Sequence, residues 1–401
     1  MRKFIACLVA FLLVIPLSGC SLVQQFLQVP DADKYLDAYQ NKPQYLTLTD
    51  QQKKCYGSIY TALTDGMATD ETVFIGETSE TETVTYSYPG IQVRLPSPMQ
   101  SKEEIDLLYN AFFRDNPQFF YVRHVYGMMG YAVQDQVWYD TLVLTYTGDA
   151  AHRLEATQQL EEVVTAVLAE KPDTNDQYVT ELYLHDRLTA GCTYDQSAAE
   201  AGYESVPLAY TAYGALVEGT AVCEGYAKAM QLLLERCGID SVLVTGQSIE
   251  NGEQHMWNLV TINGEPYHLD PTWNDTDDQL RHTFFNVTDQ RLSQTHVVEN
   301  QPSNVLCTAT TDNYYIRTNT YVDTYERQQI AHIIAERINA GDTRIELLFS
   351  PDTFDNGLLF LKNVGMTQKL VQPYLEGETT ALWTYTLSGD SDLHILFITK
   401  N

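Results

Sequence analysis

The sequence predicts an α+β protein with more than one domain. Some segments repeat apolar residues at helical spacing, whereas others are rich in the aromatic and β-branched residues that strands prefer. Between two strand-like runs lies the dipeptide Asn263-Gly264, which is typical of a two-residue hairpin turn. A chain of 401 residues, of which 44% are hydrophobic, is long and apolar enough for two or three domains with real cores.

The chain has a large excess of acidic residues. It contains 24 Lys and Arg against 53 Asp and Glu, which gives a formal net charge of −29. This balance argues against nucleic acid as a partner, because phosphate contacts need clustered Lys and Arg. The charge instead favours a folded body that repels its own copies and stays dispersed.

Residues 1–19 are typical of an export signal. A basic start precedes an apolar run over residues 4–15, which is too short to span a membrane. The tetrad Leu17-Ser18-Gly19-Cys20 follows and resembles a bacterial lipobox. The resemblance implies cleavage before Cys20 and lipidation of its thiol, so that an extracytoplasmic protein is anchored to the cell membrane. The alternative is an ordinary signal peptide with an incidental cysteine.

Residues 20–33 show no clear period and are expected to form a lipid-anchored tether, and residues 34–170 predict an accessory α+β region. Strand-like runs are expected at 84–95, 119–126 and 137–146. One helix is expected after the capping box that begins at Ser101, and a longer helix after the N-cap Asp149.

The features that suggest chemistry all fall within residues 171–305, and residues 306–401 predict a small C-terminal α+β domain. The cysteines in the body of the chain form no C-x-x-C pair, which argues against a structural zinc site. Their odd number leaves at least one thiol free or intermolecular. They are Cys55, Cys192, Cys223, Cys237 and Cys307.

Residues 219–227 lead into a predicted helix that ends before Gly238. Thr220 is expected to cap this helix, which places Cys223 in its first turn. There the unpaired N–H groups and the helix dipole favour a thiolate, and the same groups could bind an oxyanion. The alternative is that Cys223 is only a small buried hydrophobic residue.

The predicted hairpin brings a histidine and a carboxylate to one face of a sheet. A two-residue turn fixes three pairs: Ile262 with Glu265, Trp257 with Asp270, and His255 with Thr272. Asp270 is then a diagonal neighbour of His255, at roughly 7–8 Å between backbones. A carboxylate in this position can orient an imidazole that acts as a general base. The alternative is a structural strand histidine. His268 falls on the same face, as a supporting or a merely structural residue.

Several separated motifs, taken together, resemble the transglutaminase-like superfamily. Order and spacing match the family's Cys, His and Asp, and a lead-in helix with a Thr-Tyr-Asp segment precedes them. The matching segments are Gly-Thr-Ala-Val-Cys-Glu-Gly-Tyr-Ala (219–227), Cys-Gly-Ile (237–239), His-Met-Trp-Asn-Leu-Val (255–260), Tyr-His-Leu-Asp-Pro-Thr-Trp (267–273), His-Asp-Arg-Leu (185–188) and Thr-Tyr-Asp (193–195).

The resemblance implies a papain-like core, in which a nucleophile helix packs on an antiparallel sheet, and a catalytic triad. Cys223 would be the nucleophile, His255 the base and Asp270 its orienter. The backbone N–H of Cys223 would supply one oxyanion donor. Tyr194 is the preferred second donor, with Trp257 behind it. The family usually has a small residue after the histidine where this chain has Met256, which we expect to point to the opposite face.

Together with the predicted lipid anchor at Cys20, the resemblance implies a surface-anchored thiol enzyme that acts on protein or peptide amides and needs no metal or other cofactor. Its acyl-enzyme would pass to water, as in a protease or deamidase, or to an amine, as in a cross-linking transglutaminase. One alternative is a non-catalytic binding or scaffold lipoprotein that keeps the fold. A second, a solute-binding lipoprotein, has only the predicted anchor in its favour.

Overall fold

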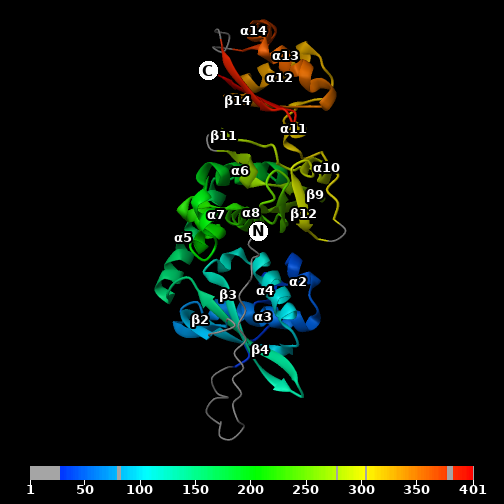
Figure 1. The fold of residues 1–401 in the computed structure, drawn as a ribbon. Coiled ribbons are helices and arrows are strands. Elements are labelled where there is room, and N and C mark those ends of the chain that lie inside the picture. Colours follow the sequence, from blue (N-terminus) through cyan, green and yellow to red (C-terminus); the bar gives the residue numbers. More distant parts are fainter. Residues whose placement is uncertain (1–27, 79–82, 277–278, 303–304, 377–382, 401) are drawn as a thin grey trace. The chain divides into compact units, whose positions relative to one another are not determined.

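The computed structural model describes residues 28–78, 83–276, 279–302, 305–376 and 383–400 (Figure 1). It divides into two compact units. Unit 1 holds the described residues up to Asp173 together with Gly191–Gly238. Unit 2 holds Thr174–Ala190 together with the described residues from Ile239 onward. Both units combine helices with mainly antiparallel sheets, which confirms the predicted α+β class. The domain boundaries predicted at 170/171 and 305/306 stay predictions.

The predicted export signal and the lipidation site Cys20 lie outside the described residues. Within the part of the chain that the structure describes, none of the helices combines the length and the apolar character that crossing a membrane requires.

Unit 1 contains a four-stranded antiparallel sheet in the order β1-β2-β4-β3 (Figure 1). Helices α3 (Asp50–Asp65) and α4 (Lys102–Asp115) both contact strand β2. As predicted, Ser101 caps α4 by accepting a hydrogen bond from the backbone N–H of Glu104 at 3.3 Å. The strands are β1 (Glu71–Thr78), β2 (Thr83–Met99), β3 (Val122–Val133) and β4 (Gln136–Tyr146).

The remaining elements of unit 1 are mostly short, apart from two helices. Asp149 caps the longer of them, α5, as predicted, by accepting from the N–H of His152 at 2.9 Å. These elements are α1 (Leu36–Tyr39), α2 (Pro43–Thr47), η1 (Pro117–Phe119), α5 (Ala150–Ala169), β5 (Thr193–Tyr194), α7 (Gln196–Ala201), η2 (Pro207–Tyr210), η3 (Gly214–Glu218), β6 (Thr220–Ala221) and α8 (Cys223–Arg236).

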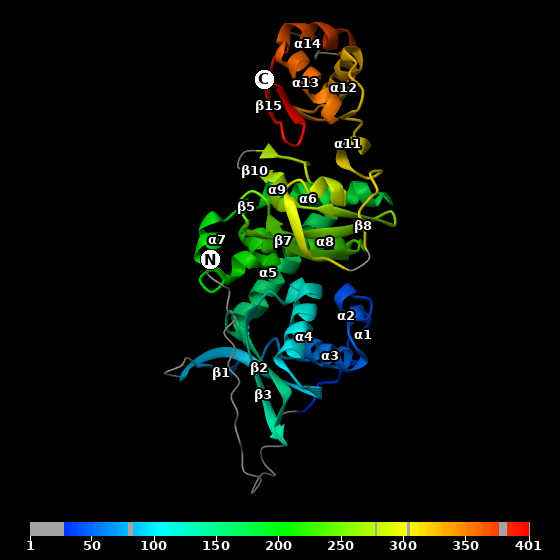
Figure 2. The ribbon, with the colours of Figure 1, turned by 45° about the vertical axis from the view of Figure 1, so that its right-hand side comes forward.

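Unit 2 contains a first antiparallel sheet in the order β12-β7-β8-β9, whose strands β7 and β8 run side by side in Figure 2. Its hairpin has the predicted register, because Ile262 pairs with Glu265. Asn263 and Gly264 both have positive φ, 52° and 88°, as a type I′ turn requires. The strands are β7 (Ser241–Ser248), β8 (Gln254–Ile262), β9 (Glu265–Leu269) and β12 (His296–Asn300).

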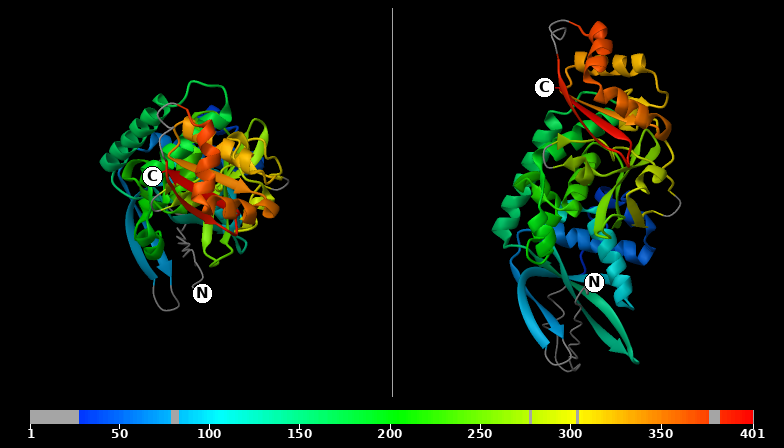
Figure 3. Two further views of the ribbon diagram at one scale, coloured as in Figure 1. Left: turned by 90° about the horizontal axis from the view of Figure 1, so that it is seen from above. Right: turned by 45° about the horizontal axis from the view of Figure 1, so that its top comes forward.

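A second four-stranded sheet in unit 2 has the order β13-β14-β16-β15 and carries helices on one face (Figure 3). Its strand β16 alternates between two cores. Leu396 and Ile398 pack in the core formed with these helices, whereas Ile395 and Phe397 share a core with Val244 and Trp257 of the first sheet. The residues on either side of position 305 therefore share one hydrophobic core.

The second sheet and its helices complete unit 2, together with short connecting elements. Its parts are α6 (Gln177–Gly191), α9 (Pro271–Asn274), β10 (Asp275–Thr276), β11 (Gln279–Leu280), α10 (Asp289–Leu292), α11 (Tyr314–Arg317), β13 (Tyr321–Val322), α12 (Arg327–Asn339), β14 (Arg344–Phe349), α13 (Pro351–Lys362), α14 (Val364–Val371), η4 (Gln372–Tyr374), β15 (Tyr385–Asp390) and β16 (Ile395–Lys400).

Candidate active site

Cys223 is the first residue of helix α8 in unit 1, which confirms its predicted place in the first turn. The expected cap was wrong: Val222 is the N-cap residue, and Thr220 instead belongs to β6, where it pairs with Thr193. The Cys223 thiol is free and half-buried. Because the first N–H groups of a helix have no partner within it, this position offers them to a negative charge on or near the sulfur.

Tyr194 lies beside the segment that leads into α8. The strands β5 and β6 are parallel, and Tyr194 pairs with Ala221, two positions before Cys223. The backbone N–H of Asp195 donates to the carbonyl of Ala221 at 2.9 Å and extends this pairing. The preferred candidate for the second oxyanion donor thus belongs to the same unit as the proposed nucleophile and lies on a strand paired with the segment just before it.

Glu224 places a partly buried carboxylate directly after the cysteine, and its charge is balanced within unit 1. Its Oε1 lies 2.6 Å from Nζ of Lys228, one helical turn further on. Burial alone would raise the pKa of Glu224, but the positive charge of Lys228 lowers it below its ordinary value. The Glu224–Lys228 pair therefore reduces the repulsion that a lone carboxylate would exert on a thiolate at Cys223.

His255 and Asp270 form the predicted pair in unit 2. Nε2 of His255 lies 2.8 Å from Oδ2 of Asp270, and both side chains are buried. Since Nε2 is directed to the carboxylate, Nδ1 is the ring nitrogen that would exchange a proton with a nucleophile. Met256 follows on the opposite face of β8, as expected from the alternation of a strand.

The pairing predicted beyond Leu269 was wrong. The ladder between β8 and β9 ends at Asn258 and Leu269, so the backbones of Asp270 and Thr272 are not paired with β8. Pro271, which lacks an N–H group, instead begins the short helix α9. Asp270 still reaches His255, because the two-residue turn leaves both residues on the same face of the hairpin.

Asp270 accepts four hydrogen bonds. It caps α9, where Oδ1 accepts from the backbone N–H groups of Thr272 at 3.0 Å and Trp273 at 3.2 Å. Oδ2 faces His255 and also Nε2 of His296, at 3.2 Å. Burial alone would raise the pKa of the Asp270 carboxyl, but the charge and hydrogen bond of His255, together with the hydrogen bond of His296, lower it below its ordinary value. Asp270 is therefore held as an anion.

The sequence reasoning missed His296. This buried residue begins β12, 26 positions after Asp270, and no local motif surrounds it. Its place at the site follows from the pairing of β12 with β7, a long-range contact. No strand was predicted at residues 296–300, and therefore no pairing with β7 either, so nothing in the sequence indicated that His296 lies at the site.

Trp257 and His268 lie on the face predicted for them, where they bind each other. The indole N–H of Trp257 donates to Nδ1 of His268 at 3.1 Å, so the proton of His268 is on Nε2, which donates to Oδ1 of Asp289 at 2.8 Å. The side chain of Trp257 is fully buried. Because its only donor is already used, Tyr194 remains the candidate for the second oxyanion donor.

Three groups of side chains in the described part of the chain have the residue types that bind metals, with their potential ligand atoms within 4.8 Å of one another. Two lie at the hairpin: His255 with Asp270 and His296, and His268 with Asp289 and Cys307. Both nitrogens of His268 already have hydrogen-bond partners, as described above. Oδ2 of Asp270 is shared by two imidazoles.

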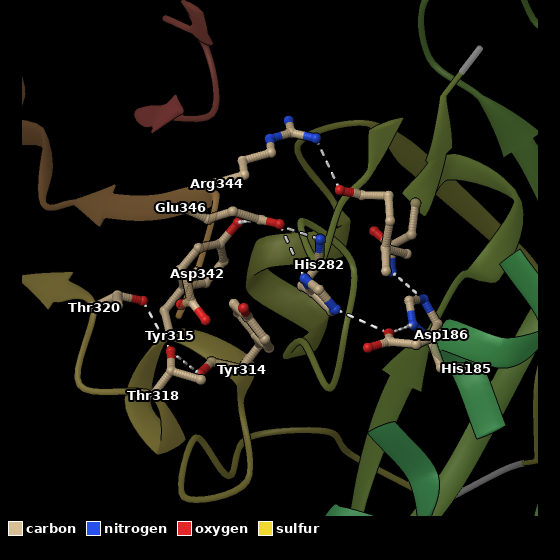
Figure 4. Close-up of polar contacts among 12 residues, drawn as sticks. His185, Asp186, His282, Tyr314, Tyr315, Thr318, Thr320, Asp342, Arg344 and Glu346 are labelled. Carbon is tan, nitrogen blue, oxygen red and sulfur yellow. Dashed lines mark hydrogen bonds and ion pairs between the residues drawn. The ribbon is translucent and has the colours of Figure 1, made fainter. Parts of the chain in front are cut away.

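The third group, His185 with Asp186 and His282, is shown in Figure 4. Oδ1 of Asn274 accepts from the N–H of Phe284 at 2.9 Å, so its Nδ2 group donates to Nε2 of His185 at 3.0 Å. The proton of His185 is then on Nδ1, which donates to Asp186 at 2.8 Å. If a metal bound Nδ1 of His185, the proton of this ring would have to move to Nε2. There it would face the N–H group of Asn274, so two donors would meet. These residues therefore do not fit a metal ion.

His282 instead bridges two carboxylates (Figure 4). Its Nε2 lies 3.0 Å from Oδ1 of Asp186 on α6, and its Nδ1 lies 3.0 Å from Oε1 of Glu346 on β14. Burial alone would lower the pKa of His282, but the charge of Glu346 and the hydrogen bonds to both carboxylates raise it to about 9. The His282 imidazolium thus joins α6 to the second sheet within unit 2.

Comparison with known proteins agrees with the motifs at this site. A family model described as the transglutaminase-like superfamily matches residues 163–271. The chain contains a transglutaminase-like domain. Cys223, His255 and Asp270 all lie inside the matched segment of this domain, whereas His296 lies beyond it. No match was found among curated proteins.

Solved structures similar to the chain include one described as a TGase, with 13% identity and a TM-score of 0.28 over 48% of this chain and 53% of the other. A candidate cysteine protease from Cytophaga hutchinsonii has 15% identity and a TM-score of 0.24, over 34% and 53%. A candidate protease from Parabacteroides distasonis has 13% identity and a TM-score of 0.22, over 49% and 35%. The chain thus spans about half or less of the length of these proteins.

Proposed function

We propose that the chain is a thiol enzyme that acts on amide bonds of proteins or peptides. Cys223 is its nucleophile, His255 its base and acid, and Asp270 the residue that orients His255. The observation that carries the proposal is the buried 2.8 Å contact between His255 and Asp270 in a transglutaminase-like domain that also has a free cysteine at a helix start.

In the proposed reaction, His255 takes the proton of the Cys223 thiol, and the thiolate attacks the carbonyl carbon of the amide. The tetrahedral intermediate collapses as His255 gives its proton to the nitrogen of the leaving amine, and a thioester on Cys223 remains. Water then attacks the thioester with His255 as base, which releases an acid and the thiol. An amine in place of water gives a new amide, that is, a cross-link.

Oxyanion stabilisation in this scheme belongs to unit 1. The backbone N–H of Cys223, the first of helix α8, is one donor, and the hydroxyl of Tyr194 is proposed as the second. The helix dipole favours the negative charge at the same place. We further propose that lipidated Cys20 anchors this enzyme on the outer side of the cell membrane, where its substrates are proteins or peptides of the envelope.

An activated acyl ester tests the proposal without knowledge of the natural substrate. With p-nitrophenyl acetate, the wild-type protein should release a burst of nitrophenol and carry an acetyl thioester on Cys223, located by peptide mass spectrometry. Cys223→Ala should abolish the burst. His255→Ala should slow acylation by about a hundredfold, because general acid–base help of that order is lost.

Cys237 provides the matched control, because it is a second free and half-buried thiol in the same protein. Cys237→Ala should leave the burst unchanged. If acetyl groups appear on Cys223 and Cys237 at equal rates, or if His255→Ala acylates as fast as the wild type, the enzyme assignment fails. The binding or scaffold function would then be the better account of the fold.

A further inference from the structure

His296 lies next to the His255–Asp270 pair because strand β7 pairs with β12 on one side and with β8 on the other. It pairs with Ser248 of β7, and His255 pairs with Gly246 of the same strand from the other side. Since Gly246 also pairs with Val298, two positions from His296, the side chains of His255 and His296 point to the same face of the sheet. Their ring centroids are 5.4 Å apart.

Gly246 of β7, which pairs with His255 on one side and with Val298 on the other, leaves room for the indole of Trp257. A Cβ atom on Gly246 would lie 2.8 Å from the ring of Trp257 and 2.1 Å from the carbonyl oxygen of Val297. Both distances are shorter than a side chain tolerates. Only glycine therefore lets the Trp257 indole lie over β7, where its centroid is 5.1 Å from that of His296.

The ring of His296 is also held in a fixed orientation. Trp273 packs on it at 4.2 Å between centroids and Phe284 at 5.3 Å, and its side chain is fully buried. Its Nδ1 lies 2.8 Å from Oγ1 of Thr295. With the ring locked on both sides, Nε2 is aimed at Oδ2 of Asp270.

Asp270 consequently has no freedom to turn. Helix α9 fixes Oδ1 by two backbone N–H groups, and the two imidazoles fix Oδ2. Without His296, Oδ2 would keep only His255, and a buried lone pair would lose its donor. The carboxylate could then rotate or shift by a fraction of an ångström, and His255 would shift with it.

We propose that His296 is a positioning residue, which donates from Nε2 to Oδ2 of Asp270 and thereby holds the His255–Asp270 pair in its productive geometry. The role deepens the proposed thiol chemistry and rests on it, since a positioned base matters only if Cys223 is activated. His296 itself touches neither substrate nor nucleophile in this scheme.

Two substitutions separate hydrogen bonding from packing. His296→Gln keeps an N–H donor near the place of Nε2 but loses the ring, whereas His296→Phe keeps a ring but loses the donor. If His296 acts through its hydrogen bond, iodoacetamide should alkylate Cys223 at pH 6 about tenfold more slowly in His296→Phe, and within about threefold of wild type in His296→Gln, because small misplacements of a base are costly. The opposite order would show that His296 only packs, and would overturn the proposal.

A second readout does not depend on the cysteine. In histidine-labelled protein, NMR should show a low-field Nε2–H resonance of His255, assigned by its absence in His255→Ala. It should move upfield or broaden in His296→Phe and be restored in His296→Gln; an unchanged resonance in His296→Phe would also overturn the proposal. A third outcome separates the two proposals. If Cys223 is alkylated slowly already in the wild type, but the His255 resonance changes in His296→Phe and is restored in His296→Gln, the proposed thiol-enzyme function fails. The positioning of His255 and Asp270 by His296 would still hold.

Discussion

At the scale of single residues, the described site is organised around the Asp270 carboxylate. Two imidazoles and two backbone N–H groups converge on it, and each removes some of the cost of burying its charge. A carboxylate satisfied in this way stays ionised and keeps the N–H of His255 on Nε2. In the proposed reaction, Nδ1 of His255 is the atom that exchanges protons.

Asp270→Asn tests this assignment. The amide keeps the shape of the carboxylate, but it loses the charge and must turn either its oxygen or its NH₂ group toward the two imidazoles. We expect acylation of Cys223 by p-nitrophenyl acetate to fall by about a hundredfold or more, since an orienting carboxylate in a triad is worth at least that much.

Asp289→Asn is the matched control, because Asp289 also accepts from a buried histidine, His268, but has no proposed part in the chemistry. It should lower the melting temperature and leave the acylation rate within a few-fold of wild type. Equal losses of rate in both variants would indicate a general loss of folding, and no loss in Asp270→Asn would remove Asp270 from the mechanism.

At the scale of secondary structure, the hairpin shows how much the sequence could predict. Asn263-Gly264 fixed the turn type, the turn fixed the register, and the register placed His255 and Asp270 on one face. These are short-range effects. The end of the ladder at Leu269 was missed, because strand alternation was continued through Pro271, where the missing N–H favours a helix start.

The partners that come from distant segments could not be predicted from local patterns. His296 enters the site by the pairing of an edge strand, a contact between segments far apart in the sequence. The hydrogen bond from Trp257 to His268 crosses the predicted hairpin, but the shared face alone did not show that the two side chains bond. The place of Cys223 in the first turn of α8 was predicted correctly although its supposed cap, Thr220, was not: the N-cap is Val222, two positions further on.

His282 links helix α6 to strand β14 and should make the stability of unit 2 depend on pH. Its pKa is raised from 6.5 to about 9, so its contribution to stability is complete below about pH 6.5 and is lost as the pH rises through about 9. A shift of this size corresponds to roughly 3 kcal/mol at 1.36 kcal/mol per pKa unit. We therefore expect the free energy of unfolding of unit 2 to fall by about 2–3 kcal/mol over this range.

His282→Gln should lower stability at pH 6 and remove this part of the pH dependence. Urea unfolding followed by tryptophan fluorescence measures it, because Trp257, Trp273 and Trp383 lie in unit 2. His332→Gln is the control: it removes a half-exposed histidine paired with Glu336 on α12, and it should change little. A pH profile of His282→Gln that parallels the wild type would contradict the assigned charge.

At the scale of the whole molecule, the sequence combines an acidic body with a proposed lipid anchor. The net charge of −29 keeps copies apart, and two or more acyl chains on Cys20 would hold the protein stably at a membrane surface.

In a bacterial host, labelled palmitate should enter the wild-type protein, and Cys20→Ala should lose the label and leave the membrane fraction. Cys7→Ala, which changes a cysteine inside the predicted signal, is the control and should keep the label. Equal labelling of wild type and Cys20→Ala would reject the anchor.

The central claim, that Cys223 is a nucleophile activated by His255, concerns residues of both units and is tested most directly by thiol reactivity. The measurement is the rate of iodoacetamide alkylation between about pH 4 and pH 9, assigned to each cysteine by mass spectrometry, in wild type and His255→Ala. The account predicts fast labelling of Cys223 below pH 7, slow labelling of Cys237 in the same sample, and loss of the fast reaction in the variant. Slow labelling of Cys223 that rises only at alkaline pH and is unchanged in His255→Ala would contradict it.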